Sequence, residues 1–475
     1  MKNSIFYIIA ILIASSMTAF GQNDSNIEGN WLGVLDTGSG VKLRIVLKIT
    51  KTDDDYTAKL DSPDNGLKDL PIDSITKNDK TVSFSAAKFV VSYEGTLNEK
   101  NDEIIGTIKQ GSASSPLNLK RFVGEITLKR PQDPIKPYPY KEEEVSYRNE
   151  KDNVKLAGTL TMPRGEGKFP AVVLITGSGA QDRDSTVLGH RPFLVLADYL
   201  TRKGIAVLRV DDRGIGGSDS GSPLATTENY VGDVLAGVEF LKNRKEINSE
   251  QIGLIGHSEG GVIAPITAAA STDVAFIVML AGAGQTGADT ILTQMALISK
   301  KGGESDENIA QAVDLQKDLF AIIKSEPDDK LAENKINEML AGRKSKMSEQ
   351  ESRAFAQTEA NIKAQMSLLL SPWYRYYLAY DPRPTLEKVK IPVLALNGEN
   401  DLQISSKENL ALISAALKAG KNKDFTVKSF PKLNHLFQTS RTGLPGEYKT
   451  IDETIAPQVL EIITDWILKH TVSQN

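Results

Sequence analysis

A serine in the second half of the chain stands in a pattern that can carry nucleophilic chemistry. Ser258 lies at the centre of GHSEG, residues 256–260, directly after the apolar run 252–255 and before a segment of small residues. This order predicts a strand, a sharp turn and a helix, with the serine hydroxyl exposed at the turn. Glycines flank such a turn because a Cβ there would collide with the neighbouring strand or helix. The pattern G-x-S-x-G also occurs by chance, so the rest of the chain must decide whether Ser258 is a nucleophile.

A second glycine-rich turn offers the backbone donors that such a nucleophile needs. The run 169–175 is apolar and β-branched, which predicts a central buried strand, and TGSG follows at 176–179. Glycines after a central strand let the backbone approach a ligand, so the N–H of Ser178 and the N–H of Glu259 are candidate donors to an oxyanion. An ordinary glycine turn is the alternative. The later loop DDRGIGGS, 211–218, lacks the spacing of a nucleotide-binding loop, and we predict a buried Arg–Asp turn that shapes the site.

The order of these motifs resembles the α/β-hydrolase superfamily, and most closely its bacterial EstD-like carboxylesterases. The segments with near-identical counterparts in that group are ITGSGAQDRD at 175–184, GHRPFLVLADYL at 189–200 and GHSEGG at 256–261. The similarity extends from Glu144 to the carboxyl end and implies a mostly parallel sheet with helices on both faces. Two residues depart from the pattern: Thr176 stands where many members carry a histidine, and Ala180 where close relatives often have proline.

In this superfamily the acid and the base follow the nucleophile along the chain, each after a late strand. Asp401 lies on the turn after the predicted strand 391–397, and the resemblance to the family's G-x-x-D points to it, with Glu399 as the nearest rival. The base must be a histidine that takes the serine proton and returns it to a leaving group. Of the four histidines, His435 follows the last predicted strand, 425–430. The others are His257 beside the serine, His190 at the start of a helix and His470 near the chain end.

An insertion interrupts the alternation of strands and helices between two late strands. Residues from about 286 to 370 are helical and charged, and Ser348 with Glu351 forms a capping box. We expect a helical cap that acts as a lid over the serine, and a decoration without a role in binding is the alternative. Three aromatic residues that follow are expected to line an acyl or alcohol pocket, or to pin the cap to the core: Trp373, Tyr374 and Tyr377.

The chain before this catalytic half has a different rhythm. Within 22–130, short alternating runs separated by turn signals predict a small all-β, barrel-like domain. GNWLG around Trp31 resembles the G-x-W opening of lipocalin-like barrels, and both closure of a core and an apolar ligand site are open for this tryptophan. The proline-rich stretch 131–143 predicts a stiff linker to the α/β-hydrolase domain at 144–475. A fragment of residues 141–475 is therefore expected to be active alone.

The composition and the first residues limit which cellular compartment and which binding partners are expected. Residues 1–21 have the positive start, apolar run and small residues of a secretory signal peptide, and an uncleaved membrane anchor is the alternative. The chain has no cysteine, hence neither disulfides nor a lipid-accepting cysteine, and we expect a periplasmic or secreted protein. The formal net charge is -5 with lysine and arginine spread along the chain, which argues against a nucleic-acid partner.

Together these features predict a serine hydrolase that cleaves carboxylic esters of short or medium acyl chains through an acyl-enzyme. The expected triad is Ser258, Asp401 and His435, and the expected oxyanion hole is the N–H of Ser178 and of Glu259. No cofactor and no metal are expected, since no cluster of histidines and carboxylates suggests one; the expected partner is a small-molecule ester. A thioesterase or acyltransferase, or a peptidase of the prolyl-oligopeptidase type, would keep the same triad. A ligand-binding protein with a relic triad is the non-enzymatic alternative.

Overall fold

The computed structural model of the protein describes residues 26–36, 42–53, 55–65, 67–87, 90–110, 113–124 and 129–471. The predicted signal peptide, 1–21, lies outside them. The chain forms two compact units, the first of Met1–Lys129, Val187–His190 and Lys346–Gln365, the second of Arg130–Thr186, Arg191–Ser345 and Met366–Asn475. Within the described stretches, no helix is long and apolar enough to cross a bilayer.

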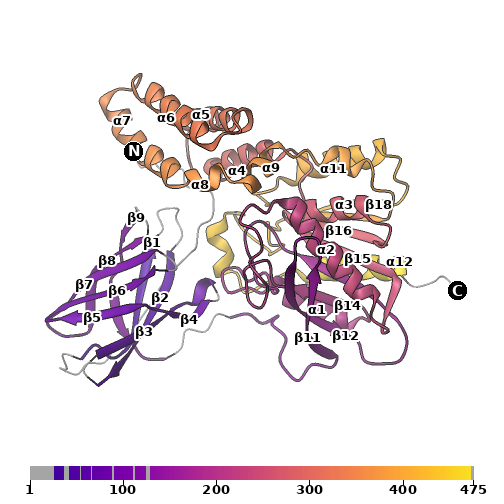
Figure 1. Ribbon diagram of the computed structural model, residues 1–475, viewed down its shortest axis with the longest axis horizontal. Coiled ribbons are helices and arrows are strands. Elements are labelled where there is room, and N and C mark those ends of the chain that lie inside the picture. Colours follow the sequence, from indigo (N-terminus) through magenta and orange to yellow (C-terminus); the bar gives the residue numbers. More distant parts are fainter. Residues whose placement is uncertain are drawn as a thin grey trace. The chain divides into compact units, whose positions relative to one another are not determined.

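The first unit is built on one antiparallel sheet of ten strands (Figure 1). In chain order these are β1 (Gly29–Asp36), β2 (Lys42–Thr52), β3 (Asp55–Ser62), β4 (Leu67–Pro71), β5 (Ser74–Asn78), β6 (Thr81–Ala86), β7 (Val91–Leu97), β8 (Glu103–Gln110), β9 (Ala113–Pro116) and β10 (Leu119–Phe122). The sheet order is β4-β3-β2-β1-β10-β8-β7-β6-β5, with β9 paired to β8. The end strands β4 and β5 are consecutive in the chain and β5 contacts β3, so the sheet curls back on itself. The all-β character is confirmed, and the likeness to lipocalins stays a prediction.

Trp31 closes the core of this sheet. Its side chain is fully buried, its Nε1–H donates to the carbonyl of Ile27 at 2.8 Å, and the Arg121 guanidinium lies 4.5 Å from the ring centroid. The chain leaves space for this packing at Gly33, where a Cβ would sit 2.7 Å from the Leu117 side chain. These contacts favour closure of a core, the simpler of the two roles considered for this tryptophan.

The second unit contains an eight-stranded sheet in which six neighbouring strands run parallel. Its strands are β11 (Lys141–Asn149), β12 (Val154–Met162), β13 (Phe169–Ile175), β14 (Ala206–Val210), β15 (Ile247–His257), β16 (Phe276–Leu280), β17 (Val393–Gly398) and β18 (Phe425–Phe430). The order is β11-β12-β14-β13-β15-β16-β17-β18. Neighbours from β14 to β18 are parallel, whereas β11 and β12 run antiparallel at one edge. The α/β class expected from the sequence is confirmed.

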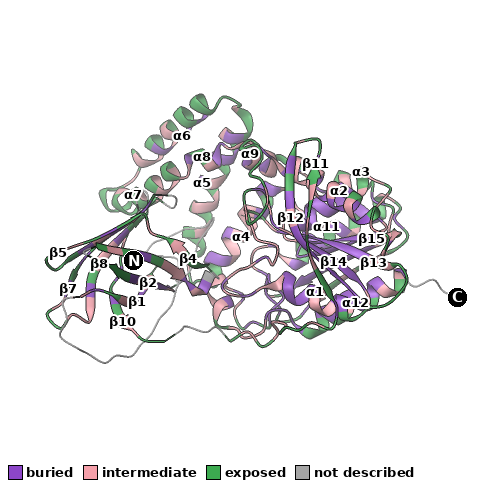
Figure 2. Ribbon diagram, turned by 60° about the horizontal axis from the view of Figure 1, so that its bottom comes forward, coloured by how far each residue is buried: buried purple, intermediate pink, exposed green. Residues whose placement is uncertain are grey.

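Helices cover both faces of this sheet, which explains why its central strands are apolar throughout (Figure 2). One face packs on α1 (Pro192–Arg202) and α12 (Pro457–Thr471), the other on α2 (Thr227–Lys242), α3 (Gly260–Ala270) and α11 (Ser406–Ala419). Side chains of β13 alternate accordingly, with Val172 and Leu174 in the first cluster and Ala171 and Val173 in the second. Each fully buried valine or leucine contributes about 1.5–3 kcal/mol, so this double burial fixes where the strands end.

Between β16 and β17 the chain forms the predicted run of helices. They are α4 (Gly287–Lys301), α5 (Asp306–Ser325), α6 (Asp329–Lys344), α7 (Glu349–Ala364), α8 (Met366–Leu369), α9 (Pro372–Ala379) and α10 (Arg383–Leu386). At the start of α7, Glu351 N–H donates to Ser348 Oγ at 3.3 Å and Ser348 N–H donates to the Glu351 carboxylate at 2.8 Å, so the predicted capping box is confirmed. Within the second unit, α9 contacts α4, α5 and α2. Helix α9 therefore links the insertion to the helices that cover the sheet.

The connector before β11 is bound to the second unit through its first residues. Gln132 donates to the carbonyl of Ile455 at 2.7 Å and accepts from the N–H groups of Thr454 and Ile455. The Asp133 carboxylate pairs with Arg191 at 2.7 Å. These contacts place residues 130–133 within the second unit, so a fragment that begins at residue 141 lacks part of that unit.

We predict that Gln132→Ala lowers the free energy of unfolding of the second unit by about 1–3 kcal/mol, because it strands two buried backbone N–H groups. Thermal unfolding of the full-length protein measures this effect. Ile135→Ala is the control, since that side chain is 85% exposed in the same connector. Equal melting temperatures for Gln132→Ala and Ile135→Ala would contradict the prediction.

Candidate active site

Ser258 sits on a strained turn at the carboxyl end of β15. Its φ is +56°, a left-handed backbone that non-glycine residues rarely adopt. The N–H of Ser258 donates to the carbonyl of Leu280, at the end of β16, at 2.9 Å, and α3 begins two residues later, at Gly260. The serine is only partly buried. Its hydroxyl is thus presented at the edge of the sheet, as a nucleophile elbow requires.

The two glycines of the elbow are required by close backbone approaches. A Cβ at Gly256 would lie 1.9 Å from the carbonyl oxygen of Gly260, and a Cβ at Gly260 would lie 2.2 Å from the carbonyl oxygen of Ile175 in β13. Both distances are far below any tolerated contact. The chain can therefore make this turn only with glycine at both places.

Asp401 and His435 lie together after β17 and β18. The Nδ1–H of His435 donates to Asp401 Oδ2 at 2.8 Å, and both side chains are buried. The other carboxylate oxygen of Asp401 accepts from the N–H groups of Gln403 and Ile404 at 2.8 and 2.9 Å, which fixes its orientation. Because Nδ1 faces the carboxylate, His435 keeps Nε2 as the basic nitrogen.

The rival acid has a different environment. Glu399 is exposed and its carboxylate accepts from the Ser429 hydroxyl at 2.8 Å. The histidine at the chain end is also elsewhere, because His470 contacts Asp424 and the carbonyl of Trp466. Of the candidate acids, Asp401 is the one bonded to His435.

His257 connects the elbow to His435. Its Nε2–H donates to the carbonyl of His435 at 2.8 Å, and the two rings lie 4.7 Å apart between centroids. Burial, with a contribution from His435, lowers the pKa of His257 to about 3, so this ring is neutral. Within the described residues no hydrogen bond joins Ser258 Oγ to His435 Nε2. The hydrogen bond from His257 to the carbonyl of His435 is the contact that brings His435 next to the elbow.

The glycine turn after β13 is held at both ends by Asp212. Thr176 Oγ1 donates to the Asp212 carboxylate at 2.8 Å, and the N–H of Gln181 donates to it at 2.8 Å. Between them, Gly177 passes so close to the elbow that a Cβ would lie 3.1 Å from Ser258 Cβ. Among the described residues, neither Ser178 N–H nor Glu259 N–H has a protein acceptor. Both donors are therefore available beside the serine.

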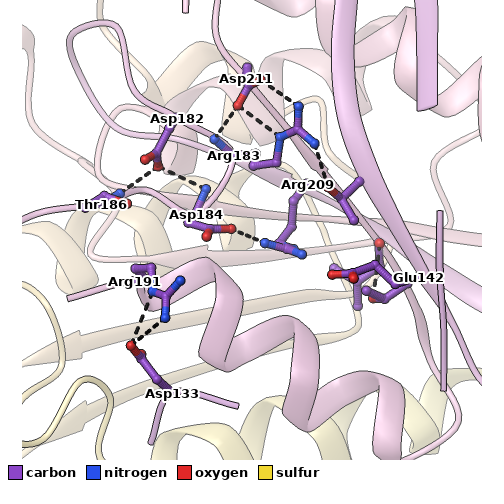
Figure 3. A network of polar contacts seen from close by, with 12 residues as sticks. Asp133, Glu142, Asp182, Arg183, Asp184, Thr186, Arg191, Arg209 and Asp211 are labelled. Atoms are coloured by element: carbon purple, nitrogen blue, oxygen red, sulfur yellow. Dashed lines mark hydrogen bonds and ion pairs between the residues drawn. The ribbon is translucent and has the colours of Figure 1, made fainter. Parts of the chain in front are cut away.

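The segment after this turn is fixed by ionic contacts with the strands behind it (Figure 3). Arg183 binds Asp211 through Nη2 at 2.7 Å and also pairs with Glu144, and Arg209 pairs with Asp184. Figure 3 shows Arg183 reaching toward Asp211, and Arg209 reaching toward Asp184. The Arg183–Asp211 and Arg209–Asp184 pairs are largely buried. Buried pairs contribute orientation more than net stability, so their effect is to hold the turn in one place.

The Glu259 side chain is buried and points to α9. Its Oε1 accepts from Thr227 Oγ1 at 2.8 Å and from Trp373 Nε1 at 3.0 Å. A cavity of about 10 Å³ lies beside it, lined in part by Tyr377, which is room for about one water molecule. Burial raises the pKa of Glu259, against the effect of the hydrogen bonds from Trp373 and Thr227.

The three aromatic residues expected at the pocket have different surroundings. Trp373 contacts Glu259 and stacks on Tyr377, with ring centroids 5.7 Å apart, so both are near the elbow. Tyr374 is 1% exposed and packs edge-on against Phe320 of α5. Its position favours the alternative role, that of holding the insertion together.

The sequence does not predict the side-chain roles of Asp212 and Glu259. It predicts a buried Arg–Asp turn within 211–218, but the arginine of this loop pairs outside it: Arg213 binds Asp233 and Asp152, each at 2.6 Å. The sequence signal for the role of Asp212 is Thr176, which stands where many family members carry a histidine. Its hydroxyl donates to the Asp212 carboxylate. For Glu259 no local signal exists, because its partners are distant in the chain.

The chain belongs to the hydrolase family Hydrolase_4, described as Serine aminopeptidase, S33, whose model matches residues 191–440. It is also similar to the esterase EstD of Thermotoga maritima, with 24% identity over 455 residues, covering 92% of this chain and 98% of the relative.

Two solved structures are similar at lower levels. The Pyrococcus furiosus esterase PF2001 has a TM-score of 0.43 and 15% identity, covering 73% of this chain and 98% of that one. Est1E of Butyrivibrio proteoclasticus, solved with ferulic acid bound, has a TM-score of 0.40 and 16% identity, covering 69% and 98%.

We predict that Asp212→Asn stabilises the protein at high pH and not at low pH. Burial, aided by the charges of Asp233 and Glu259, raises the pKa of Asp212 from 3.8 to about 7. The protonated form is thus favoured in the folded state, and its stabilising contribution is lost as the pH rises from about 4 through 7. Asparagine mimics the protonated form, so its advantage is on the order of a few kcal/mol at pH 8 and disappears below about pH 4.

Thermal unfolding of both proteins from pH 4 to pH 8 measures this difference. Asp219→Asn is the control on the same loop, at an exposed position. A difference that does not depend on pH would show that Asp212 does not titrate in this range.

Proposed function

We propose that the protein is a serine hydrolase that cleaves carboxylic esters, with Ser258 as nucleophile, His435 as general base and acid, and Asp401 as its orienting carboxylate. The observation that carries the proposal is the Asp401–His435 hydrogen bond of 2.8 Å at the ends of β17 and β18, joined through His257 to a serine with φ +56°. A buried carboxylate that fixes an imidazole beside a strained serine is the arrangement that activates a hydroxyl.

The chemistry follows from these positions. Ser258 Oγ attacks the acyl carbonyl carbon while His435 Nε2 takes the hydroxyl proton. The carbonyl oxygen becomes an oxyanion, stabilised by the N–H groups of Ser178 and Glu259. The intermediate collapses to an acyl-enzyme, and His435 gives its proton to the leaving alcohol. Water then attacks the acyl carbon, with His435 again as base, and the acid is released.

The substrate class is part of the proposal. The relative that matches nearly the whole chain is named an esterase, which favours an ester over an amide. Short or medium acyl chains are the proposed substrates, with Trp373 and Tyr377, which stack on each other beside Glu259, as walls of the acyl site. A peptidase is the second candidate, because the family description is that of a serine aminopeptidase; a thioesterase or acyltransferase would use the same groups.

We also propose that the protein is exported, on the sequence of residues 1–21 and the absence of cysteine. A periplasmic or secreted enzyme would act on esters outside the cytoplasm.

A fluorophosphonate probe is expected to label the wild-type protein and not Ser258→Ala, because the probe phosphonylates only an activated serine. Ser271→Ala, at the end of α3, is the matched control and should label like the wild type. Labelling of Ser258→Ala would remove the serine from the proposal.

Substrate choice needs a second measurement on the same preparation. We expect faster hydrolysis of p-nitrophenyl butyrate than of an acyl-thioester or an aminoacyl anilide. Faster cleavage of the anilide would replace the esterase by the peptidase.

The two carboxylates of the late turn can be separated by isosteric changes. Asp401→Asn should lower kcat by about 10⁴-fold, because the amide favours the wrong histidine tautomer, with little change in melting temperature. Glu399→Gln should leave kcat within about twofold, since the Glu399 carboxylate accepts from the exposed Ser429 hydroxyl, a bond that an amide oxygen can keep. If Glu399→Gln lost activity and Asp401→Asn kept it, the assignment of the acid would be reversed.

A further inference from the structure

Gln181 closes the glycine turn through its side chain. Its backbone N–H donates to the Asp212 carboxylate at 2.8 Å, and its backbone carbonyl accepts from the N–H of Asp212 at 3.0 Å. The backbone of Gln181 is therefore committed to the neighbouring loop. Its side-chain Nε2–H donates instead to the carbonyl of Ser178, three residues earlier, at 3.3 Å. The side-chain amide thus takes the place that a backbone N–H has in an ordinary tight turn.

The middle of the turn depends on this contact. Ser178 is exposed and lies between two glycines, Gly177 and Gly179, the second of which has φ +87°. Glycine leaves the backbone more conformational freedom than any other residue does. Within residues 129–471, no other hydrogen bond joins the protein to the backbone of Ser178. Loss of the Gln181 amide would therefore leave the Ser178 peptide free to rotate.

The side-chain amide of Gln181 is itself held in place. Its Oε1 accepts from the hydroxyl of Ser185 at 2.7 Å, and Ser185 is 4% exposed. Because the carbonyl of Ser178 can only accept, the NH₂ end of the amide must face the turn and the oxygen must face Ser185. Ser185 has φ +53°, a left-handed conformation that costs a serine free energy and that is concentrated at functional sites.

The loop around Ser185 imposes this conformation. The Asp182 carboxylate accepts from the N–H groups of Asp184 and Thr186, at 3.1 and 2.9 Å (Figure 3). The N–H of Ser185 donates to the carbonyl of Asp182 at 2.8 Å. The ion pairs described above anchor the same segment to the strands. These contacts therefore reach the glycine turn through Ser185 and Gln181.

We propose that Gln181 is a positioning residue of the oxyanion hole, which holds the Ser178 peptide so that its N–H faces the carbonyl oxygen of an acyl group on Ser258. A Cβ at Gly177 would lie 3.1 Å from Ser258 Cβ and 3.4 Å from Gln181 Nε2. The amide and the nucleophile therefore lie beside the same residue of the turn. The proposal rests on the function proposed above.

The first test removes the amide donor in the full-length protein. Gln181→Met keeps the length of the side chain and loses both hydrogen bonds, whereas Gln181→Glu keeps an acceptor for Ser185 and has no donor for Ser178. Each should lower kcat for p-nitrophenyl acetate by about 10–100-fold, less than the loss for a deleted oxyanion donor, with KM changed less than about threefold. Gln311→Met, at an exposed position of α5, is the matched control and should keep wild-type kcat.

Ser185→Gly separates positioning from folding. The variant removes the hydroxyl that orients the amide, but glycine adopts the left-handed backbone without strain. Relief of this strain offsets the lost hydrogen bond, so the melting temperature should stay close to that of the wild type. The kcat should still fall by about 3–10-fold, less than for loss of the amide itself. Because Ser185 acts through Gln181, Ser185→Gly should add no further loss to Gln181→Met.

A trifluoromethyl ketone inhibitor reports on the oxyanion hole directly. The nucleophilic serine adds to its carbonyl, and the adduct carries an oxyanion in the position of the transition-state oxygen. In the Gln181 variants its inhibition constant should therefore rise by the same factor as kcat/KM falls. A residue that only stabilised the fold would not produce this proportionality.

The outcomes are decisive in each direction. Wild-type kcat in Gln181→Met or Gln181→Glu would overturn the positioning role, and so would an unchanged inhibition constant for the trifluoromethyl ketone. Multiplicative losses in Gln181→Met with Ser185→Gly would show that Ser185 acts by another route and overturn its place in the proposal. A wild-type protein that neither labels with fluorophosphonate nor cleaves the ester would instead reject the proposed function.

Discussion

The catalytic unit depends on one close crossing of the backbone, where β15 turns into α3. At this point the chain passes so near to itself and to β13 that a side chain at Gly256 or Gly260 would overlap a carbonyl oxygen. The left-handed conformation of Ser258 costs about 1–3 kcal/mol, and it persists because β16, through the carbonyl of Leu280, and β13 leave no other path. The position of the Ser258 hydroxyl, the proposed nucleophile, is thus set by the packing of buried strands. The serine contributes little to its own placement.

Around this turn, three acidic side chains are held by groups that are mostly neutral. Asp401 is fixed by two backbone N–H groups and a histidine, Asp212 by a hydroxyl and a backbone N–H, and Glu259 by a hydroxyl and an indole. The raised pKa values of Asp212 and Glu259 show the cost of this burial. Oriented dipoles fixed before the reaction are what electrostatic catalysis uses, and the cost is met by the double-sided core of the sheet.

The sequence predicts the parts of this site that depend on local pattern and chain order. Local patterns of a few residues are enough to recognise glycines beside a serine, apolar runs and a histidine after the last strand. Asp401 and His435, predicted in this way, do lie together. Contacts between distant side chains cannot be read in this way. Trp373 and Glu259 are separated by 114 positions, and Arg213 pairs with Asp152 and Asp233 instead of the aspartates beside it. For the same reason the sequence left Glu399 as a rival acid.

The insertion and the catalytic groups differ in how they are attached, and this limits how the substrate range can change. Ser258, Asp401 and His435 follow strands whose ends the sheet fixes, so substitutions in α4 to α9 leave their backbone positions intact. Residues of α9 are different, because Trp373 donates to Glu259, the residue directly after Ser258. A replacement that lacks a donor at Trp373 leaves a buried carboxylate with one hydrogen bond fewer, at a cost of about 1–3 kcal/mol. An insertion that accommodates a new substrate must therefore still supply a donor to Glu259, or Glu259 must change with it.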